Sequence, residues 1–398
     1  LRECDAIGVK RIVIVSGGFS EGGDTGAQLH RDVASFTAGK GIRVLGPNTL
    51  SPVNTGNNLA ISFNHVRRMK SGRISLAFQS GFFESRINWL LSSVGISKLL
   101  DMGNKMDINE VDALQYFALD PETEAIAMHM EGIRGDARTF FSVLTEVARR
   151  KPTIILKSGR TSAGSRASLS HTGSIAREND VILDGVLRQT GALRAQNLEE
   201  FFDLVKAFGR LDLPKGNRLA IITMSGGEGV MGMDACEVFG LLPARLGGKT
   251  RDKLAPFQPP WEMPLNPFDN GVAIQFHMPS PLEFCKGLLA IPEDENVDCA
   301  IMQMPPGTFT PETSNADIPP DVAEALHEEF TQGFVNMKKA GKPFALWRSA
   351  MDAGEQEWIE EIESRGMPVF ESCERAIRCL AAMHRYRSRN LLDSSSKQ

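Results

Sequence analysis

The chain has 398 residues, of which 42% are hydrophobic and 23% are charged, a composition typical of folded globular proteins and not of disordered ones. Its formal net charge is −5 and it contains no basic block, which argues against nucleic acid or an anionic membrane as its main partner. No apolar run approaches the length of about 20 residues that a membrane span needs. No signal peptide is visible, and the six cysteines form no CxxC pair, so we expect a reduced, cytoplasmic protein.

Short apolar runs rich in β-branched residues recur along the chain, and stretches with helical periodicity lie between them. Runs without polar alternation are typical of strands covered on both faces, as in parallel sheets. The expected strands include 11–16, 73–79, 153–157, 218–223 and 299–304, and the expected helices include 107–118, 136–149, 198–208, 227–239, 323–339 and 374–385. This alternation predicts a doubly wound α/β fold.

The expected elements fall into three segments. Residues 1–65 carry two strands and a helix, which is too little for a complete α/β domain. Residues 66–213 and 214–388 each open with a strand, a Ser-Gly turn and a helix, which indicates two related halves. The remaining residues, 389–398, are polar and are expected to form a disordered tail.

The stretch 157–174, with the sequence KSGRTSAGSRASLSHTGS, places a single histidine, His171, among small residues after an expected strand. Such a segment suits a loop that moves or that wraps phosphate with backbone N–H groups. A histidine there can act as a nucleophile or as a general base. On composition alone, a solvated surface loop explains the stretch equally well.

Two expected strands run into turns of small residues that open helices, at Ser80-Gly81 and at Ser225-Gly226-Gly227. The free N–H groups and the positive end of the helix dipole make each turn a ready anion site. Two such turns can grip one phosphoryl group from opposite sides. Each turn by itself is more often an ordinary packing device than a ligand site.

Glu131 closes the expected strand 124–130 at its carboxyl end, the edge at which open α/β sheets bind ligands. Its carboxylate can hold one nitrogen of an imidazole and leave the other nucleophilic. The alternative is a solvated residue at a strand end. His129, which lies within the same strand, has the sequence context of a structural residue.

Two further polar turns follow strands and can form the rim of a ligand site: Gly46-Pro47-Asn48 and Gly103-Asn104. Asp107 is expected to cap the next helix, with Glu110 three residues later completing a capping box. The seven histidines are scattered without metal-ligand spacing, so we expect no metal site.

In their order along the chain, these motifs resemble the α-type subunit of nucleoside-diphosphate-forming acyl-CoA synthetases, the superfamily of succinyl-CoA synthetase and the ADP-forming acetyl-CoA synthetases. The motifs that carry the resemblance are Gly46-Pro47-Asn48, Gln79-Ser80-Gly81, Gly103–Asp107, Glu131-Gly132, Lys157–Arg160, Ser170–Ser174, Ser225–Gly227 and Asn266–Asp269. The resemblance implies an α/β fold in which a partial Rossmann-like CoA-binding domain precedes two flavodoxin-like doubly wound parallel-sheet domains.

The resemblance also implies an activity, which converts acyl-CoA, phosphate and ADP to a carboxylic acid, CoA and ATP, and the reverse, through an acyl phosphate and a phosphohistidine. By resemblance, His171 is phosphorylated and Glu131 supports it. The remaining implied sites are Ser80, Gly81, Ser225, Gly226 and Gly227 for phosphate, and Gly46, Pro47, Asn48, Gly103 and Asn104 for CoA and the acyl group. No tightly bound cofactor is expected. CoA and Mg-ATP or ADP are substrates, and an ATP-grasp β-type subunit or domain binds the nucleotide in an oligomeric enzyme.

The chain departs from the family pattern beside both phosphate turns. Glu228 stands where the family often has proline, and its charge would oppose phosphate binding if it faced the site. Phe82, Phe83 and Glu84 replace small residues and can reshape the acyl pocket. Two other functions therefore stay open: a catalytically inactive module that senses acyl-CoA or phosphate, as in some protein lysine acetyltransferases, and a flavodoxin-like nucleotide or flavin binder. The second lacks a complete GxGxxG fingerprint.

Overall fold

The structure is a computed structural model, and it describes residues 1–50, 52–79, 81, 83–172, 180–277, 287–305, 320–348 and 353–395. The chain divides into two compact units, Leu1–Val205 (unit 1) and Lys206–Gln398 (unit 2). Helix α8 (Leu198–Arg210) carries the chain from one unit to the other. Unit 1 includes the segment expected at 1–65 and residues 66–205 of the segment expected at 66–213, and the boundaries of the expected segments stay predictions.

Unit 1 begins with a small β-α-β piece. Its elements are α1 (Arg2–Ala6), β1 (Arg11–Val13), α2 (Gly23–Gly39) and β2 (Arg43–Leu45). The two strands are parallel, with Arg11 beside Arg43 and Val13 beside Leu45. Parallel strands joined by a helix are the repeating unit of Rossmann-type folds, in agreement with the expected partial domain.

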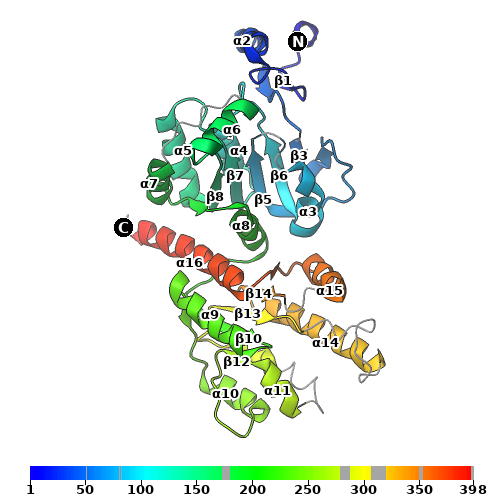
Figure 1. Ribbon diagram of the computed structural model, residues 1–398, viewed down its shortest axis with the longest axis vertical. Coiled ribbons are helices and arrows are strands. Elements are labelled where there is room, and N and C mark those ends of the chain that lie inside the picture. Colours follow the sequence, from blue (N-terminus) through cyan, green and yellow to red (C-terminus); the bar gives the residue numbers. More distant parts are fainter. Residues whose placement is uncertain are drawn as a thin grey trace. The chain divides into compact units, whose positions relative to one another are not determined.

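The main sheet of unit 1 has the strand order β4-β3-β6-β5-β7-β8-β9 among the described residues (Figure 1). Its strands are β3 (Pro52–Asn54), β4 (Leu59–Ala60), β5 (Ser71–Phe78), β6 (Ile96–Asp101), β7 (Ala125–Met130), β8 (Thr153–Lys157) and β9 (Leu193–Ala195). The strands from β6 to β9 are parallel, and β3 adds to β6 as part of an antiparallel hairpin. In the order of the chain, the parallel strands are arranged 2-1-3-4-5, the order of flavodoxin.

Helices cover both faces of this sheet. The helices of unit 1 in this region are α3 (Ile87–Trp89), which continues as a π-turn to Val94, α4 (Glu110–Leu119), α5 (Ala137–Arg150), α6 (Ser162–Thr172) and α7 (Asp180–Thr190). One core cluster joins the sheet to α4, α5 and α7 through side chains such as Phe117, Phe140 and Leu187. Trp89 of α3 contacts Phe202 of α8, and Phe83, which precedes α3, contacts both Phe201 and Phe202.

The predicted capping box of α4 is wrong by two residues. Asn109 is the N-cap, its side chain accepts a hydrogen bond from the Val111 N–H at 2.9 Å, and Asp112 completes the box by accepting from the Asn109 N–H. Asp107 instead accepts hydrogen bonds from the Arg43 guanidinium and the Val44 N–H, both at 2.8 Å. Asp107 therefore binds Arg43, which lies on β2 and is distant in the sequence, although local spacing predicts that Asp107 caps the helix.

Unit 2 repeats the flavodoxin-like strand order. Its sheet runs β11-β10-β13-β14-β15, all parallel, and β12 pairs with β10. The strands are β10 (Arg218–Thr223), β11 (Leu242–Pro243), β12 (Phe268–Asp269), β13 (Cys299–Gln303), β14 (Phe344–Trp347) and β15 (Val369–Phe370). The order 2-1-3-4-5 in both units agrees with the two related halves expected from the sequence.

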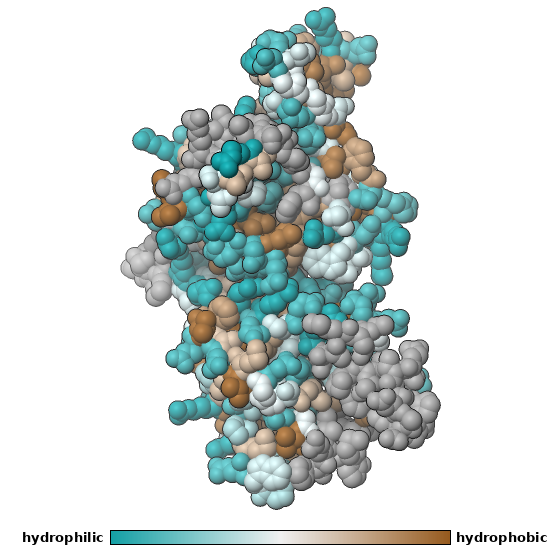
Figure 2. All heavy atoms as spheres, in the orientation of Figure 1, coloured by the Kyte–Doolittle hydropathy of each residue, from teal (hydrophilic) through white to brown (hydrophobic). Residues whose placement is uncertain are grey.

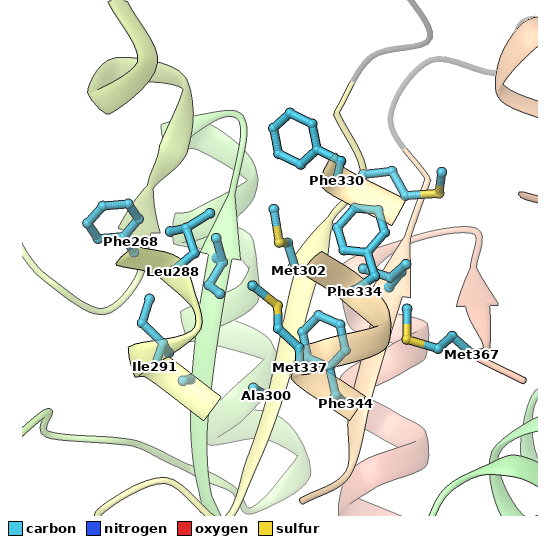
Figure 3. Close-up of a cluster of buried hydrophobic side chains, with 14 of the residues drawn as sticks. Phe268, Leu288, Ile291, Ala300, Met302, Phe330, Phe334, Met337, Phe344 and Met367 are labelled. Atoms are coloured by element: carbon cyan, nitrogen blue, oxygen red, sulfur yellow. The ribbon is translucent and has the colours of Figure 1, made fainter. Parts of the chain in front are cut away.

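Two groups of helices surround the sheet of unit 2. Helices α9 (Gly226–Phe239) and α16 (Cys373–Ser395) pack on each other. The second group contains α10 (Gly248–Leu254), α11 (Asn270–His277), α13 (Ala290–Glu293), α14 (Pro320–Lys339) and α15 (Ala353–Ser364). Figure 3 shows Phe334 and Met337 of α14 packed against Met302 of β13 and Phe344 of β14. The tail expected to be disordered from residue 389 is helical as far as Ser395, because α16 continues through it.

On the face drawn in Figure 2, hydrophilic residues predominate and apolar residues form scattered patches. Within the described ranges, no helix has the length and apolar character that a membrane span requires. Cys4, Cys236, Cys299, Cys373 and Cys379 are free thiols.

Candidate functional site

Glu131 lies at the switch point of unit 1, between β5 and β7, where the strand order reverses. The Glu131 N–H donates to Gln79 Oε1 at 3.1 Å, and Gln79 Nε2 contacts Glu131 Oε2 at 3.4 Å. Both side chains are buried, with 1% of Gln79 and 7% of Glu131 exposed. Glu131 is therefore a fixed, buried carboxylate at the ligand-binding edge of the sheet, and not a solvated strand end.

Two buried lysines hold the backbone beside Glu131. Lys157 Nζ donates to the Glu131 carbonyl oxygen at 2.7 Å, and Lys105 Nζ donates to the Gly132 carbonyl oxygen at 2.7 Å. Lys105 also forms an ion pair with the buried Glu110 carboxylate. These hydrogen bonds from two ammonium groups fix the turn after β7, from which the Glu131 side chain extends. Sequence reasoning assigned neither lysine a role, although both lie in motifs that carried the resemblance.

His129 is a buried neutral residue. Its Nε2 lies 2.9 Å from Ser158 Oγ, and 2% of the residue is exposed. Burial, together with the positive charges of Lys105 and Lys157, lowers the pKa of His129 to about 3. A histidine that stays neutral through the physiological range and packs beside Phe83 has the structural role that its sequence context indicates.

His171 lies near the carboxyl end of α6, whose helical residues extend from Ser162 to Thr172, so this part of the Gly- and Ser-rich stretch is a helix and not a loop. The His171 side chain and residues 173–179 lie outside the described part of the chain. The flanks of this segment are joined, because Arg160 forms an ion pair with Asp180 at 3.1 Å and Arg194 also pairs with Asp180. The first of these ion pairs holds the two ends of the His171 segment close together, and the second ties its carboxyl end to β9.

The Asp101 carboxylate connects two of the predicted turns, Ser80-Gly81 and Gly103-Asn104, with the chain just after a third, Gly46-Pro47-Asn48. Its Oδ2 accepts hydrogen bonds from the N–H groups of Leu50 at 2.8 Å and Gly81 at 3.0 Å, and its Oδ1 accepts one from the Gly103 N–H at 3.0 Å. Asp101 ends β6 and is 3% exposed. Ser80, the other predicted phosphate residue of this turn, lies outside the described residues. Sequence reasoning missed Asp101, although an acidic residue that closes an apolar strand was a usable signal.

The two turns expected to bind CoA and the acyl group contact each other. The Asn104 N–H donates to the Pro47 carbonyl oxygen at 2.8 Å, and Asn48 Nδ2 lies 3.4 Å from Asn104 Oδ1. A Cβ atom on Gly103 would lie 2.1 Å from the Pro47 carbonyl oxygen, so only glycine permits this approach. Gly46 and Pro47 are buried and Asn48 is partly exposed, which leaves one polar side chain of the first turn at the surface.

Glu21, which sequence reasoning did not select, completes this rim from the loop after β1. It accepts hydrogen bonds from the Gly18 N–H at 2.7 Å and from the Asn104 side chain. Burial works to raise the pKa of Glu21, but the hydrogen bonds from backbone N–H groups and from Asn104 hold it below its usual range. The rim therefore presents an ionised carboxylate beside the amide groups.

In unit 2, the predicted phosphate turn lies at the switch point between β10 and β13. Ser225 is the N-cap of α9 but makes no side-chain cap hydrogen bond, and the first helical bond joins the Gly229 N–H to the Ser225 carbonyl oxygen. Ser225, Gly226 and Gly227 are exposed. No described residue accepts a hydrogen bond from the Gly226 or Gly227 N–H, so these donors stay available to an anion.

Phe83 belongs to the core of unit 1. It is 3% exposed and its ring contacts Phe201 and Phe202 of α8. Phe82 and the Glu84 side chain lie outside the described residues. Three or more His, Cys, Asp or Glu side chains that could share a metal ion are not found together in the described part of either unit.

Comparison with known proteins identifies the family of this chain. Residues 71–208 match the family model of the succinyl-CoA ligase like flavodoxin domain, and this range contains the parallel strands β5 to β9 of unit 1. Over 380 residues, the chain is 33% identical to the α subunit of the ADP-forming acetate–CoA ligase II of Pyrococcus furiosus, which covers 94% of this chain and 78% of that subunit. The chain belongs to the family of ADP-forming acyl-CoA ligases. The resemblance drawn from the motifs is therefore confirmed, as is its α-type character.

Comparison with two other proteins shows how far the similarity extends along each chain. The chain is 33% identical over 395 residues to the ADP-forming acetate–CoA ligase II of Archaeoglobus fulgidus, but it spans only 56% of that relative's length. A solved structure of the dinucleotide forming acetyl-coenzyme A synthetase 1 of Ca. Korarchaeum cryptofilum, in complex with phosphate and ADP, superimposes with a TM-score of 0.83 at 28% identity. This likeness covers 99% of the present chain and 81% of that one, and it confirms the α/β fold with flavodoxin-like sheets.

Proposed function

We propose that this chain is the α-type part of an ADP-forming acyl-CoA ligase that acts in the cytoplasm. The reaction interconverts acyl-CoA, phosphate and ADP with a carboxylic acid, CoA and ATP. The observation that carries the proposal is the buried Glu131 carboxylate at the switch point of unit 1. Gln79 holds it, and two buried lysines bind the backbone carbonyls of Glu131 and Gly132. His171 follows the neighbouring strand β8 in the chain, and membership of the family supports its role.

The proposed reaction has three steps. Phosphate attacks the thioester carbonyl, CoA leaves as the thiolate, and an acyl phosphate forms. A ring nitrogen of His171 then attacks phosphorus and the carboxylate leaves, while Glu131 accepts a hydrogen bond from the other ring nitrogen and stabilises the charged imidazole. Finally ADP takes the phosphoryl group, which forms ATP and frees the histidine.

The remaining predicted residues bind and orient the substrates. The N–H groups at Ser80-Gly81 and at Ser225-Gly226-Gly227 bind phosphate oxygens and require no competing nucleophile. The rim formed by Gly46–Asn48 and Gly103–Asn104 contacts CoA and the acyl group. An ATP-grasp β-type subunit or domain binds the nucleotide in an oligomeric enzyme. No observation favours the sensing module or the flavin binder, and neither is proposed.

Labelling with phosphate tests the proposal. The complete protein, together with its ATP-grasp part, is incubated with Mg-ATP labelled at the γ-phosphate, and phosphate that is labile in acid and stable in base is mapped by peptide. We expect the label on His171 and its loss in His171→Asn. His65→Asn is the matched control, because His65 lies outside the proposed site. Label that persists in His171→Asn would refute the phosphohistidine assignment.

Glu131→Gln separates the role of the carboxylate from its packing, because glutamine keeps the size of the side chain. We expect phosphorylation of His171 to slow by at least about tenfold, since the imidazole loses its anionic partner. The rate of labelling is measured with unchanged concentrations of Mg-ATP. An unchanged rate would assign Glu131 a purely structural role.

A further inference from the structure

Glu228 lies in the first turn of α9, and two donors from neighbouring strands hold its carboxylate. Its Oε1 accepts a hydrogen bond from Gln303 Nε2 at 2.7 Å, and its Oε2 accepts one from Trp347 Nε1 at 2.7 Å. Gln303 ends β13 and Trp347 ends β14. Gln303 is 2% exposed and Trp347 is 0% exposed, so core packing fixes the positions of both donors of hydrogen bonds to the carboxylate.

Gln303 also shapes the turn that precedes α9. Its Oε1 accepts hydrogen bonds from the Met224 N–H at 2.8 Å and from Thr223 Oγ1 at 2.9 Å. One side-chain amide therefore uses its oxygen to hold the turn and its nitrogen to hold Glu228. The Glu228 carboxylate and the predicted phosphate turn therefore belong to one hydrogen-bond network, and this network sets the direction in which the carboxylate points.

The direction of this carboxylate matters for an anion at the turn. A carboxylate in the first turn of a helix is attracted to the same N–H groups that bind a phosphate. Asp269 already places a second carboxylate nearby, since its Oδ2 would lie 2.9 Å from a Cβ atom on Gly226. Among the described residues, both Glu228 oxygens accept from side chains of the sheet and neither accepts from the Gly226 or Gly227 N–H.

We propose that Gln303 and Trp347 are positioning residues that keep the Glu228 carboxylate against the edge of the sheet, so that an anion can occupy the N–H groups at the start of α9. The inference rests on the proposed function, in which this turn binds phosphate. It explains how the chain carries a glutamate where its family often has proline and still keeps the two glycine N–H groups available.

The test removes one donor and keeps the packing. Trp347→Phe retains a buried ring but deletes the N–H that donates to Glu228. Trp358→Phe is the matched control, because Trp358 is also a buried residue of unit 2 and its Nε1 donates to Thr331 Oγ1 at 2.8 Å. Rates of the complete enzyme are measured with acyl-CoA and ADP at fixed concentrations and inorganic phosphate varied.

In Trp347→Phe, the freed carboxylate competes with phosphate, so we expect the KM for phosphate to rise by about tenfold, with kcat changed by less than about twofold. Trp358→Phe should keep the wild-type KM for phosphate. The double variant Trp347→Phe/Glu228→Gln should return the KM to the wild-type value, because the competing charge is gone. A purely structural role of Trp347 would not produce this recovery.

Two outcomes overturn the inference: equal KM values for phosphate in Trp347→Phe and Trp358→Phe, or no recovery in the double variant. If the wild-type enzyme shows no phosphate-dependent reaction, the proposed function fails. The inference is then tested separately, by measuring how much inorganic phosphate raises the Tm of the same protein. A phosphate-dependent rise that weakens in Trp347→Phe and recovers in the double variant then supports the inference separately. No effect of phosphate on the wild-type Tm overturns it.

Discussion

Protonation of His129 should destabilise unit 1 at mildly acidic pH. The ordinary histidine pKa of 6.5 falls to about 3 in the folded protein, because burial and the charges of Lys105 and Lys157 disfavour the imidazolium. As the pH falls, the unfolded chain therefore takes up this proton before the folded chain does. The stability that neutral His129 contributes is present above pH 6.5 and is lost progressively as the pH falls from 6.5 towards 3.

Linkage gives the size of this loss. Each pH unit below the unfolded pKa favours the protonated unfolded chain by about 1.4 kcal/mol, so the free energy of unfolding should fall by about 2 kcal/mol between pH 7 and pH 5. For a unit of this size, that change lowers Tm by about 4–8 °C.

His129→Gln separates the contribution of His129 to the pH dependence of stability from the contributions of other titrating groups. Glutamine can keep a hydrogen bond to Ser158, and the sheet register of unit 2 places Gln303 at the position that corresponds to His129 in unit 1. Urea unfolding at pH 7 and pH 5 is measured for the variant and the wild type. We expect the variant to lose about 2 kcal/mol less than the wild type, whatever the other histidines contribute.

Equal losses in the two proteins would refute the reasoning, because they would mean that folded His129 takes up its proton as readily as an unfolded histidine does. A larger loss in the variant would reverse the sign of the effect and would contradict the burial of a neutral imidazole. His30 and His384, whose pKa values burial also lowers, are unchanged by the substitution and cancel in the comparison.

Two further substitutions test how the strand ends of unit 1 are held together. Asp101→Asn removes an acceptor of backbone N–H groups and should lower the free energy of unfolding by about 2–3 kcal/mol in urea, whereas Asp136→Asn, at an exposed helix N-cap, should cost less than about 0.5 kcal/mol. Similar losses in both would contradict the connecting role of Asp101. Gly103→Ala should cost about 2–5 kcal/mol, because Gly103 has a φ of +54° and its Cβ would meet the Pro47 carbonyl oxygen. Gly185→Ala, which has open space in α7, should be neutral or stabilising, and a similar result for Gly103→Ala would exclude the close contact.

The sequence by itself determined the elements and the family of this protein. The apolar runs at 153–157 and 218–223 coincide with β8 and β10, and α9 begins directly after the Ser225 turn. These features are local, because a strand covered on both faces needs a continuous apolar run and a helix start needs small or polar residues. The motifs that carried the resemblance are local as well, so their order along the chain was sufficient to identify the family.

Only the tertiary structure decided which partners the polar groups take. Asp101 accepts from Leu50, which is 51 positions away in the sequence, and Glu21 accepts from Asn104 across 83 positions. The sequence marked Glu228 as a negative charge beside the phosphate turn, but donors 75 and 119 residues away decide where its carboxylate points. A carboxylate binds the best donors that folding brings within reach, and spacing along the chain does not specify which donors those are.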